Sequence, residues 1–159
     1  MNITRTKKVT ALAALPFVAA LTLSACGEEE ATETAFTKSQ NGVEMTMTYT
    51  AVGDEVVEQT TTNVIDYEAA GFESKEQAQQ TLDPLVEQSA DVEGYEQSIE
   101  YGDSSATEEI SIDYEVADMS ELSNLPGYES TQNLDEEGAF ISLEESRNML
   151  ENQGFTEVE

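Results

Sequence analysis

One stretch of the chain decides its fold class, and it reads VEMTMTYTA from Val43 to Ala51. Apolar side chains stand at every second position, and polar side chains, mostly threonine, stand between them. A period of two predicts a β-strand with one apolar face and one polar face. A strand of this kind belongs to a sheet that is covered on one side only.

Turn signals flank this strand on both sides. Asn41-Gly42 favours a type I′ hairpin turn, which would pair the strand with a short one near residues 35–40. Gly53-Asp54 is a second hairpin signal. The Val- and Thr-rich run from Val56 to Tyr67 then predicts a third strand.

The pattern next changes to helical spacing. Ser74 has a glutamine three residues later, which is the spacing of a capping box, and it predicts a helix over residues 74–89. Pro84 lies inside this helix. It predicts either a kink or a restart of the helix with Asp83 as the N-cap.

Two more strands are predicted after this helix, joined by a turn at Gly102-Asp103-Ser104. In the first strand, three apolar side chains share one face: Tyr95, Ile99 and Tyr101. In the second strand, four apolar side chains share one face: Ile110, Ile112, Tyr114 and Val116.

The last part of the chain carries further helix signals. Asp118 is a predicted N-cap for a short helical turn, and residues 127–138 are predicted to form a loop. A second capping box, Ser142 with Glu145, predicts a helix that ends at Gly154, with a short strand after it. Together the elements predict an α+β fold: an antiparallel sheet of about five to six strands with two main helices packed on one face.

The N-terminus has the form of an export signal. Arg5, Lys7 and Lys8 precede an apolar run from Val9 to Leu23, which is shorter than the roughly 20 residues that span a membrane. Its ending, Leu23-Ser24-Ala25-Cys26, resembles the lipobox of bacterial lipoproteins. The resemblance implies cleavage before Cys26 and a diacylglycerol on its sulfur. The protein would then be exported and anchored by lipid on the outer face of the bacterial cell membrane.

The alternative for this segment is an ordinary secretory signal cleaved at the same bond, which would leave the cysteine unpaired. With either signal, we expect three parts: a signal peptide over residues 1–25, an acidic tether over residues 26–34 and one folded domain over residues 35–159.

The mature chain is strongly acidic. The whole sequence has 6 basic and 34 acidic residues, and removing the signal leaves only three basic ones. Three minus 34 gives a formal charge of −31. Such a chain lacks the clustered cations that bind nucleic acid or an anionic membrane surface. Adaptation to a salty host explains the acidity, and an acidic ligand-binding face is the other explanation.

The composition also excludes several kinds of chemistry. The chain contains no histidine and only one cysteine. Triads that use histidine, disulfides within the chain and Cys- or His-ligated zinc sites are therefore excluded. No glycine-rich phosphate-binding loop occurs. We therefore predict no cofactor, no metal site and no catalytic residue.

The mature chain resembles the small YehR-like family of bacterial lipoproteins, a domain family of unknown function. Six segments carry the resemblance: Cys26, Gln40-Asn41-Gly42-Val43, Tyr49 with Gly53-Asp54, Gln59-Thr60-Thr61, Leu82-Asp83-Pro84-Leu85, and Met149-Leu150 through Gly154-Phe155. It implies an α+β lipoprotein domain with no known enzymatic activity. This chain departs from the family in charge, because it carries glutamate where its relatives carry many lysines.

The preferred functional hypothesis is a non-enzymatic binding domain at the cell surface. A candidate face for a cationic ligand consists of five acidic residues: Glu96, Glu100, Glu109, Asp113 and Glu115. One alternative is an envelope hydrolase that uses a pair of carboxylates. Another is a docking subunit of an envelope complex, for which the candidate contacts are three aromatic residues: Phe72, Tyr128 and Phe140.

Overall fold

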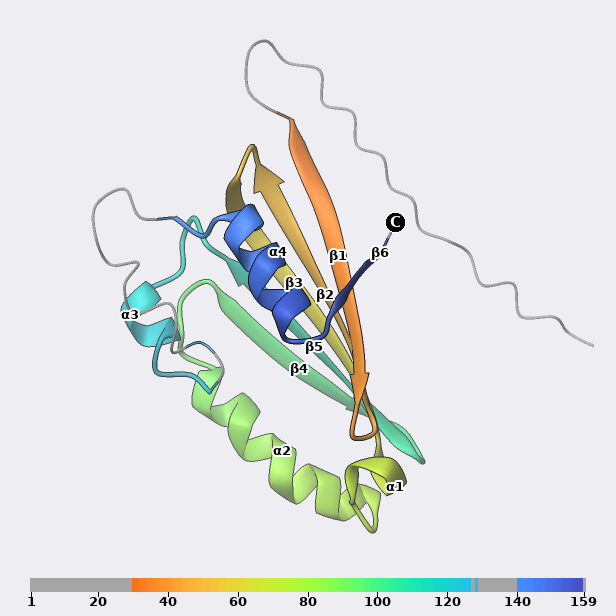
Figure 1. Ribbon diagram of the computed structural model, residues 1–159. Helices are drawn as coiled ribbons and strands as arrows, with labels where there is room; N and C mark the ends of the chain where they lie inside the picture. Colours follow the sequence, from red (N-terminus) through yellow and green to blue (C-terminus); the bar gives the residue numbers. More distant parts are fainter. Residues whose placement is uncertain (1–29, 127, 129–139, 159) are drawn as a thin grey trace, which may run out of the picture.

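The structure, a computed structural model, describes residues 30–126, 128 and 140–158. Six antiparallel strands form one sheet in the order β4-β5-β3-β2-β1-β6 (Figure 1). The strands are β1 (Ala31–Gln40), β2 (Val43–Val52), β3 (Glu55–Asp66), β4 (Tyr95–Tyr101), β5 (Ser105–Asp113) and β6 (Thr156–Val158). The helices are α1 (Tyr67–Ala70), α2 (Lys75–Ser89), α3 (Met119–Leu122) and α4 (Leu143–Asn152).

The predicted α+β class is confirmed, with α2 and α4 on the same face of the sheet (Figure 1). The capping signals are confirmed too. The side chain of Ser74 accepts a hydrogen bond from the backbone of Gln77, and that of Ser142 accepts one from Glu145. These bonds satisfy backbone donors that a helix start leaves without partners, so both helices begin where the sequence indicates.

The β1–β2 hairpin has the turn that the sequence predicts. Asn41 and Gly42 have φ angles of 53° and 78°, and a type I′ turn needs positive φ at both positions. Gly42 also lies against α1. A Cβ atom there would stand 2.5 Å from the backbone carbon of Ala69, so the contact requires glycine.

Two strand boundaries differ from the sequence prediction. β1 begins at Ala31, which pairs with Val52, so residues 31–34 belong to the sheet and not to the tether. The length of β2 offers these residues a pairing partner that their own polar sequence does not indicate. β5 ends at Asp113, and the chain then turns, with Val116 54% exposed and off the predicted apolar face. The predicted loop over residues 127–138 lies outside the described residues, apart from Tyr128.

Helix α2 runs through Pro84 without a restart. Proline removes one helical hydrogen bond, but Pro84 lies on the exposed side, where water can satisfy the freed carbonyl. Asp83 does not cap a new helix. Its carboxylate accepts a hydrogen bond of 2.7 Å from the hydroxyl of Tyr101 on β4.

The apolar core is divided into three clusters. One lies between α4 and strands β1 to β3 and includes Phe36, Tyr49 and Leu150. A second joins β4 and β5 to α3, and a third joins α1 and α2 to the ends of the neighbouring strands. Helices α2 and α4 lie apart on this face of the sheet (Figure 1).

None of the described helices covers the opposite face of the sheet (Figure 1), on which β2 exposes Glu44 and Thr46. Threonines pair across its centre, Thr46 with Thr62 and Thr48 with Thr60. One ion pair is present in the described part of the chain, between Arg147 and Glu157 at 2.8 Å. None of the described helices is both long and apolar enough to span a bilayer.

We expect stability to rise with salt. The mature chain carries a charge of −31, and its acidic side chains repel one another across an exposed surface. Salt shortens the range of this repulsion from about 8 Å at physiological strength to about 3 Å at 1 M. Thermal unfolding in low salt and in molar NaCl should show a midpoint higher by on the order of 5 °C in the salt. An unchanged or lower midpoint would contradict this expectation.

Candidate functional site: a cavity with a polar floor

A cavity of about 1010 Å³ lies between α2, α4 and the face of the sheet that these helices cover. Its walls are largely apolar and include Met45 and Met47 from β2, Leu85 from α2 and Met149 from α4. Small-molecule sites in proteins have this size and this predominance of apolar lining. The floor of the cavity, in contrast, is polar.

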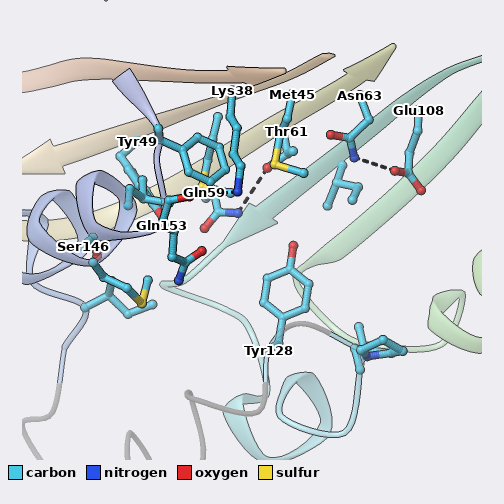
Figure 2. A pocket seen from close by; sticks show the side chains of 18 of the residues that line it. Lys38, Met45, Tyr49, Gln59, Thr61, Asn63, Glu108, Tyr128, Ser146 and Gln153 are labelled. Carbon is cyan, nitrogen blue, oxygen red and sulfur yellow. Dashed lines mark hydrogen bonds between the residues drawn. The ribbon is translucent and has the colours of Figure 1, made fainter. Parts of the chain in front are cut away.

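Five polar side chains from three neighbouring strands form this floor, and we call them the polar row. They are Gln59, Thr61, Asn63, Gln97 and Glu108 (Figure 2 labels four of them). On β3, every second residue points toward the helices, and three such positions hold Gln59, Thr61 and Asn63. Asn63 pairs with Glu108 in the β3–β5 register. Four of the five are buried, Asn63 being 8% and Glu108 9% exposed.

Hydrogen bonds connect the polar row around one carboxylate. Asn63 Nδ2 donates to Glu108 Oε2, and Gln97 Nε2 donates to Glu108 Oε1, each at 2.6 Å. The hydroxyl of Ser89 on α2 donates to Gln97 Oε1 at 2.8 Å. These bonds account for the amide donors nearest to the carboxylate.

The other end of the row is connected in the same way. Gln59 Nε2 donates to the hydroxyl oxygen of Thr61 at 3.2 Å, and the hydroxyl of Tyr114 donates to Gln59 Oε1 at 2.8 Å. Each amide nitrogen of the row therefore has one acceptor within the protein.

One acceptor of the row is left over. The amide oxygen of Asn63 is buried and has no hydrogen-bond partner. A carboxylate only accepts, so the nitrogen of Asn63 must face Glu108 and the oxygen must point away from it (Figure 2). Burying an unpaired polar atom costs about 1–3 kcal/mol. A ligand with a hydrogen-bond donor would remove this cost.

No described basic side chain forms an ion pair with Glu108. Lys38 lines the cavity, but its ammonium donates to the carbonyl of Gln153 at 2.8 Å and lies 5.3 Å from the ring centroid of Phe155. Lys75 donates to the carbonyl of Tyr101. Arg147, as noted, pairs with Glu157. The carboxylate of Glu108 is thus held by neutral amides and keeps unused acceptor capacity.

Burial raises the pKa of the tyrosines that surround the cavity. Desolvation raises the pKa of Tyr49 to about 12 and that of Tyr95 to about 12. It raises the pKa of Tyr114 further still. These phenols therefore remain protonated donors at any physiological pH.

This shift predicts alkaline unfolding. In the unfolded chain tyrosine ionises near pH 10, whereas the folded pKa values lie near 12, so the stabilisation is complete below pH 10. It is lost as the pH rises from about 10 through about 12. Phenolate absorbance and the loss of β-sheet circular dichroism should rise together above pH 10. Ionisation near pH 10 with the sheet intact would contradict the burial.

The acidic residues singled out in the sequence lie elsewhere. Glu96 and Glu100 on β4, with Glu109 and Asp113 on β5, are exposed on the open face of the sheet. Glu115 lies in the turn after β5, where its backbone amide donates to Asp113. The structure brings four of the five to one face, but none of the five lines the cavity.

The aromatic docking candidates separate into two kinds. Phe72 packs edge-on against Tyr67, and Tyr128 packs edge-on against Tyr95. Phe140 lines the cavity and is 49% exposed to solvent. In the described part of the chain, no three acidic, histidine or cysteine side chains are grouped to hold a metal ion.

The sequence analysis missed the polar row, although the sequence contains a signal for it. Ala106, Ile110 and Ile112 mark the inward face of β5, and Glu108 interrupts their spacing. A glutamate at an inward position of a strand is unusual, because glutamate is rarely buried without a partner.

Comparison with known proteins agrees with this fold. A family model described as "Protein of unknown function (DUF1307)" matches residues 32–156. The chain belongs to this family. It is 41% identical over 142 residues to the uncharacterized lipoprotein Lin0239 of Listeria innocua, covering 89% of this chain and 90% of that one. It is 30% identical over 141 residues to the uncharacterized lipoprotein YehR of Escherichia coli, covering the same shares.

Two solved structures extend the comparison. The NMR structure of Escherichia coli YehR matches with a TM-score of 0.67, over 82% of this chain and 92% of that one. An NMR structure from Streptococcus pneumoniae TIGR4, 17% identical over 99% of both chains, matches with a TM-score of 0.58 and shares the fold. The predicted YehR-like relationship is confirmed. The protein is a lipid-anchored, membrane-associated lipoprotein of the cell envelope, and the names of its relatives assign no molecular activity.

Proposed function

We propose that this DUF1307 protein is a non-enzymatic binding protein, anchored on the outer face of the cell membrane, whose cavity takes up a ligand. The observation that carries the proposal is the unpaired amide oxygen of Asn63 beside the buried carboxylate of Glu108. An apolar floor of the same shape would avoid burying these polar groups. A ligand that pairs with them gives a reason for their presence.

The geometry favours binding over hydrolysis. Hydrolysis by a carboxylate pair needs one carboxyl to exchange a proton and a second to act as nucleophile or base. Both oxygens of Glu108 accept amide hydrogen bonds within the polar row, and its paired neighbour Asn63 is an amide. A carboxylate held in this way is suited to orient a bound donor.

The proposed anchor would keep the start of β1 close to the membrane. Five residue steps separate Cys26 from Ala31, the first residue of β1. An extended chain covers at most about 3.6 Å per residue, so the first strand would begin within roughly 18 Å of the lipidated cysteine. With the anchor on the outer face of the membrane, the expected ligand is one that is present outside the cell.

A pair of tryptophan variants tests the proposal. Met47 lines the cavity, whereas Thr46, the preceding residue of β2, lies on the open face. Met47→Trp should fill part of the cavity, and Thr46→Trp adds the same side chain outside it. Every described strand pairing lies within residues 31–158, so the mature chain with Cys26→Ser retains the fold for this work.

Octylammonium, octanoate and octan-1-ol serve as probes, followed by NMR amide shifts. At least one probe should shift resonances of cavity residues in the wild type and in Thr46→Trp, and should lose affinity in Met47→Trp. The absence of any cavity shift with all three probes would contradict the proposal. So would hydrolysis of an ester or glycan substrate that disappears in Glu108→Gln.

A further inference from the structure

We propose that the ligand of this cavity presents a protonated amine on an apolar body, with the amine bound at the polar row, where the carboxylate of Glu108 and the amide oxygen of Asn63 are acceptors. This inference rests on the proposed binding function and specifies the chemistry of its ligand. Three independent features of the cavity support it: its hydrogen-bonding capacity, its charge and its walls.

The hydrogen-bonding capacity of the floor is that of an acceptor. The amide donors of Asn63, Gln97 and Gln59 already point at protein acceptors. The oxygen of Asn63 has no partner, and Glu108 has spare lone pairs. A ligand group that donates several hydrogen bonds fits these acceptors.

The charge of the cavity favours a donor that is positively charged. Two described lining residues are acidic, Glu108 and Glu145, and one is basic, Lys38. In Figure 2, Thr61 and Asn63 lie between Lys38 and Glu108, and Lys38 is bound to the carbonyl of Gln153. A buried carboxylate gains most from a partner of opposite charge, because the low local dielectric strengthens their attraction. A carboxylate or phosphate ligand would instead meet repulsion from Glu108.

The walls require an apolar body. Met45, Met47 and Met149 surround the polar row with flexible, polarisable side chains, and Leu85 and Ile110 add aliphatic surface. Methionine adapts to ligands of different shape. A small hydrophilic polyamine would leave these walls unpaired, whereas an amine with an alkyl or aromatic body would cover them.

Two glutamates on one strand give a matched pair of variants. Glu108 points into the cavity, and Glu109 points to the open face, where it belongs to the acidic face expected from the sequence. Glu108→Gln and Glu109→Gln remove the same charge from neighbouring positions. Their comparison separates a cavity site from the open acidic face.

The test measures the affinities of octylammonium, octanoate and octan-1-ol, which share one apolar body. Octylammonium should bind at least about tenfold more tightly than the other two, because only it forms charge-assisted hydrogen bonds with Glu108. Glu108→Gln should abolish this preference, and Glu109→Gln should keep it. Asn63→Met retains Glu108 and should lower the affinity for octylammonium several-fold. This variant provides the test if Glu108→Gln does not fold.

Each other outcome is decisive. Equal affinity for the three probes in the cavity, or tighter binding of octanoate, would overturn the amine proposal and leave the binding function standing. A preference for octylammonium that is lost in Glu109→Gln and kept in Glu108→Gln would move the site to the open face. Failure of every probe to reach the cavity would contradict both the ligand class and the proposed function.

Discussion

Replacing Cys26 by alanine should release the protein from the membrane almost completely. The chain belongs to a family of lipoproteins, and Cys26 is its only cysteine and follows Leu23-Ser24-Ala25. Each buried CH₂ of an acyl chain contributes about 0.8 kcal/mol, so two chains anchor a protein firmly. The acidic mature chain has no basic patch that could replace them. Fractionation of cells that express either form measures the change.

The wild-type protein supplies the complementary measurement. Mass spectrometry of protein extracted from the membrane should find a lipid-modified Cys26 at the N-terminus. A mature protein that begins elsewhere, or a Cys26→Ala form that sediments with the membrane to the same extent, would contradict the lipid anchor at this residue.

Replacing Glu108 by leucine should lower the free energy of unfolding by about 2–4 kcal/mol. The change leaves the buried amide of Asn63 and the half-buried amide of Gln97 without their acceptor, and a loss of this kind at a buried group costs about 1–3 kcal/mol. Urea unfolding of the mature chain measures the loss. Glu109→Leu, on the exposed face of the same strand, is the matched control and should change stability by no more than about 0.5 kcal/mol.

Replacing three residues of the polar row together should restore this stability. A triple variant with Asn63→Leu, Gln97→Met and Glu108→Leu removes donors and acceptor together, and such replacements are often neutral or stabilising. We expect it to unfold at a urea concentration at or above that of the wild type while losing its preference for octylammonium. A triple variant as unstable as Glu108→Leu would show that the polar row serves the fold itself.

The elements with a strong local pattern could be predicted from the sequence. The alternation from Val43 to Ala51 and the capping serines at Ser74 and Ser142 depend on neighbours a few residues away. The ends of the strands were harder to predict, because Ala31 joins the sheet only through its pairing with Val52. A boundary fixed by a partner far along the chain leaves little trace in the local sequence.

The cavity could not be predicted without knowing the register in which strands far apart in the sequence pair. Gln59, Thr61 and Asn63 lie in a strand that is polar at most of its positions, so its sequence does not show which set faces the helices. The pairing of Asn63 with Glu108 decides it, and these residues are far apart in the chain. The same register explains why the acidic residues first considered lie outside the cavity. Neighbouring residues of a strand point to opposite faces, so Glu109 cannot join Glu108.

Intermolecular NOEs between octylammonium and the mature protein test the central claim most directly. If the cavity holds the amine at its polar floor, the methylene next to the ammonium should give NOEs to the side-chain amide protons of Asn63 and Gln97. The terminal methyl group should give NOEs to the methyl groups of Met45 and Met47. NOEs to the threonines and glutamates of the open face, with none to these cavity side chains, would contradict the account.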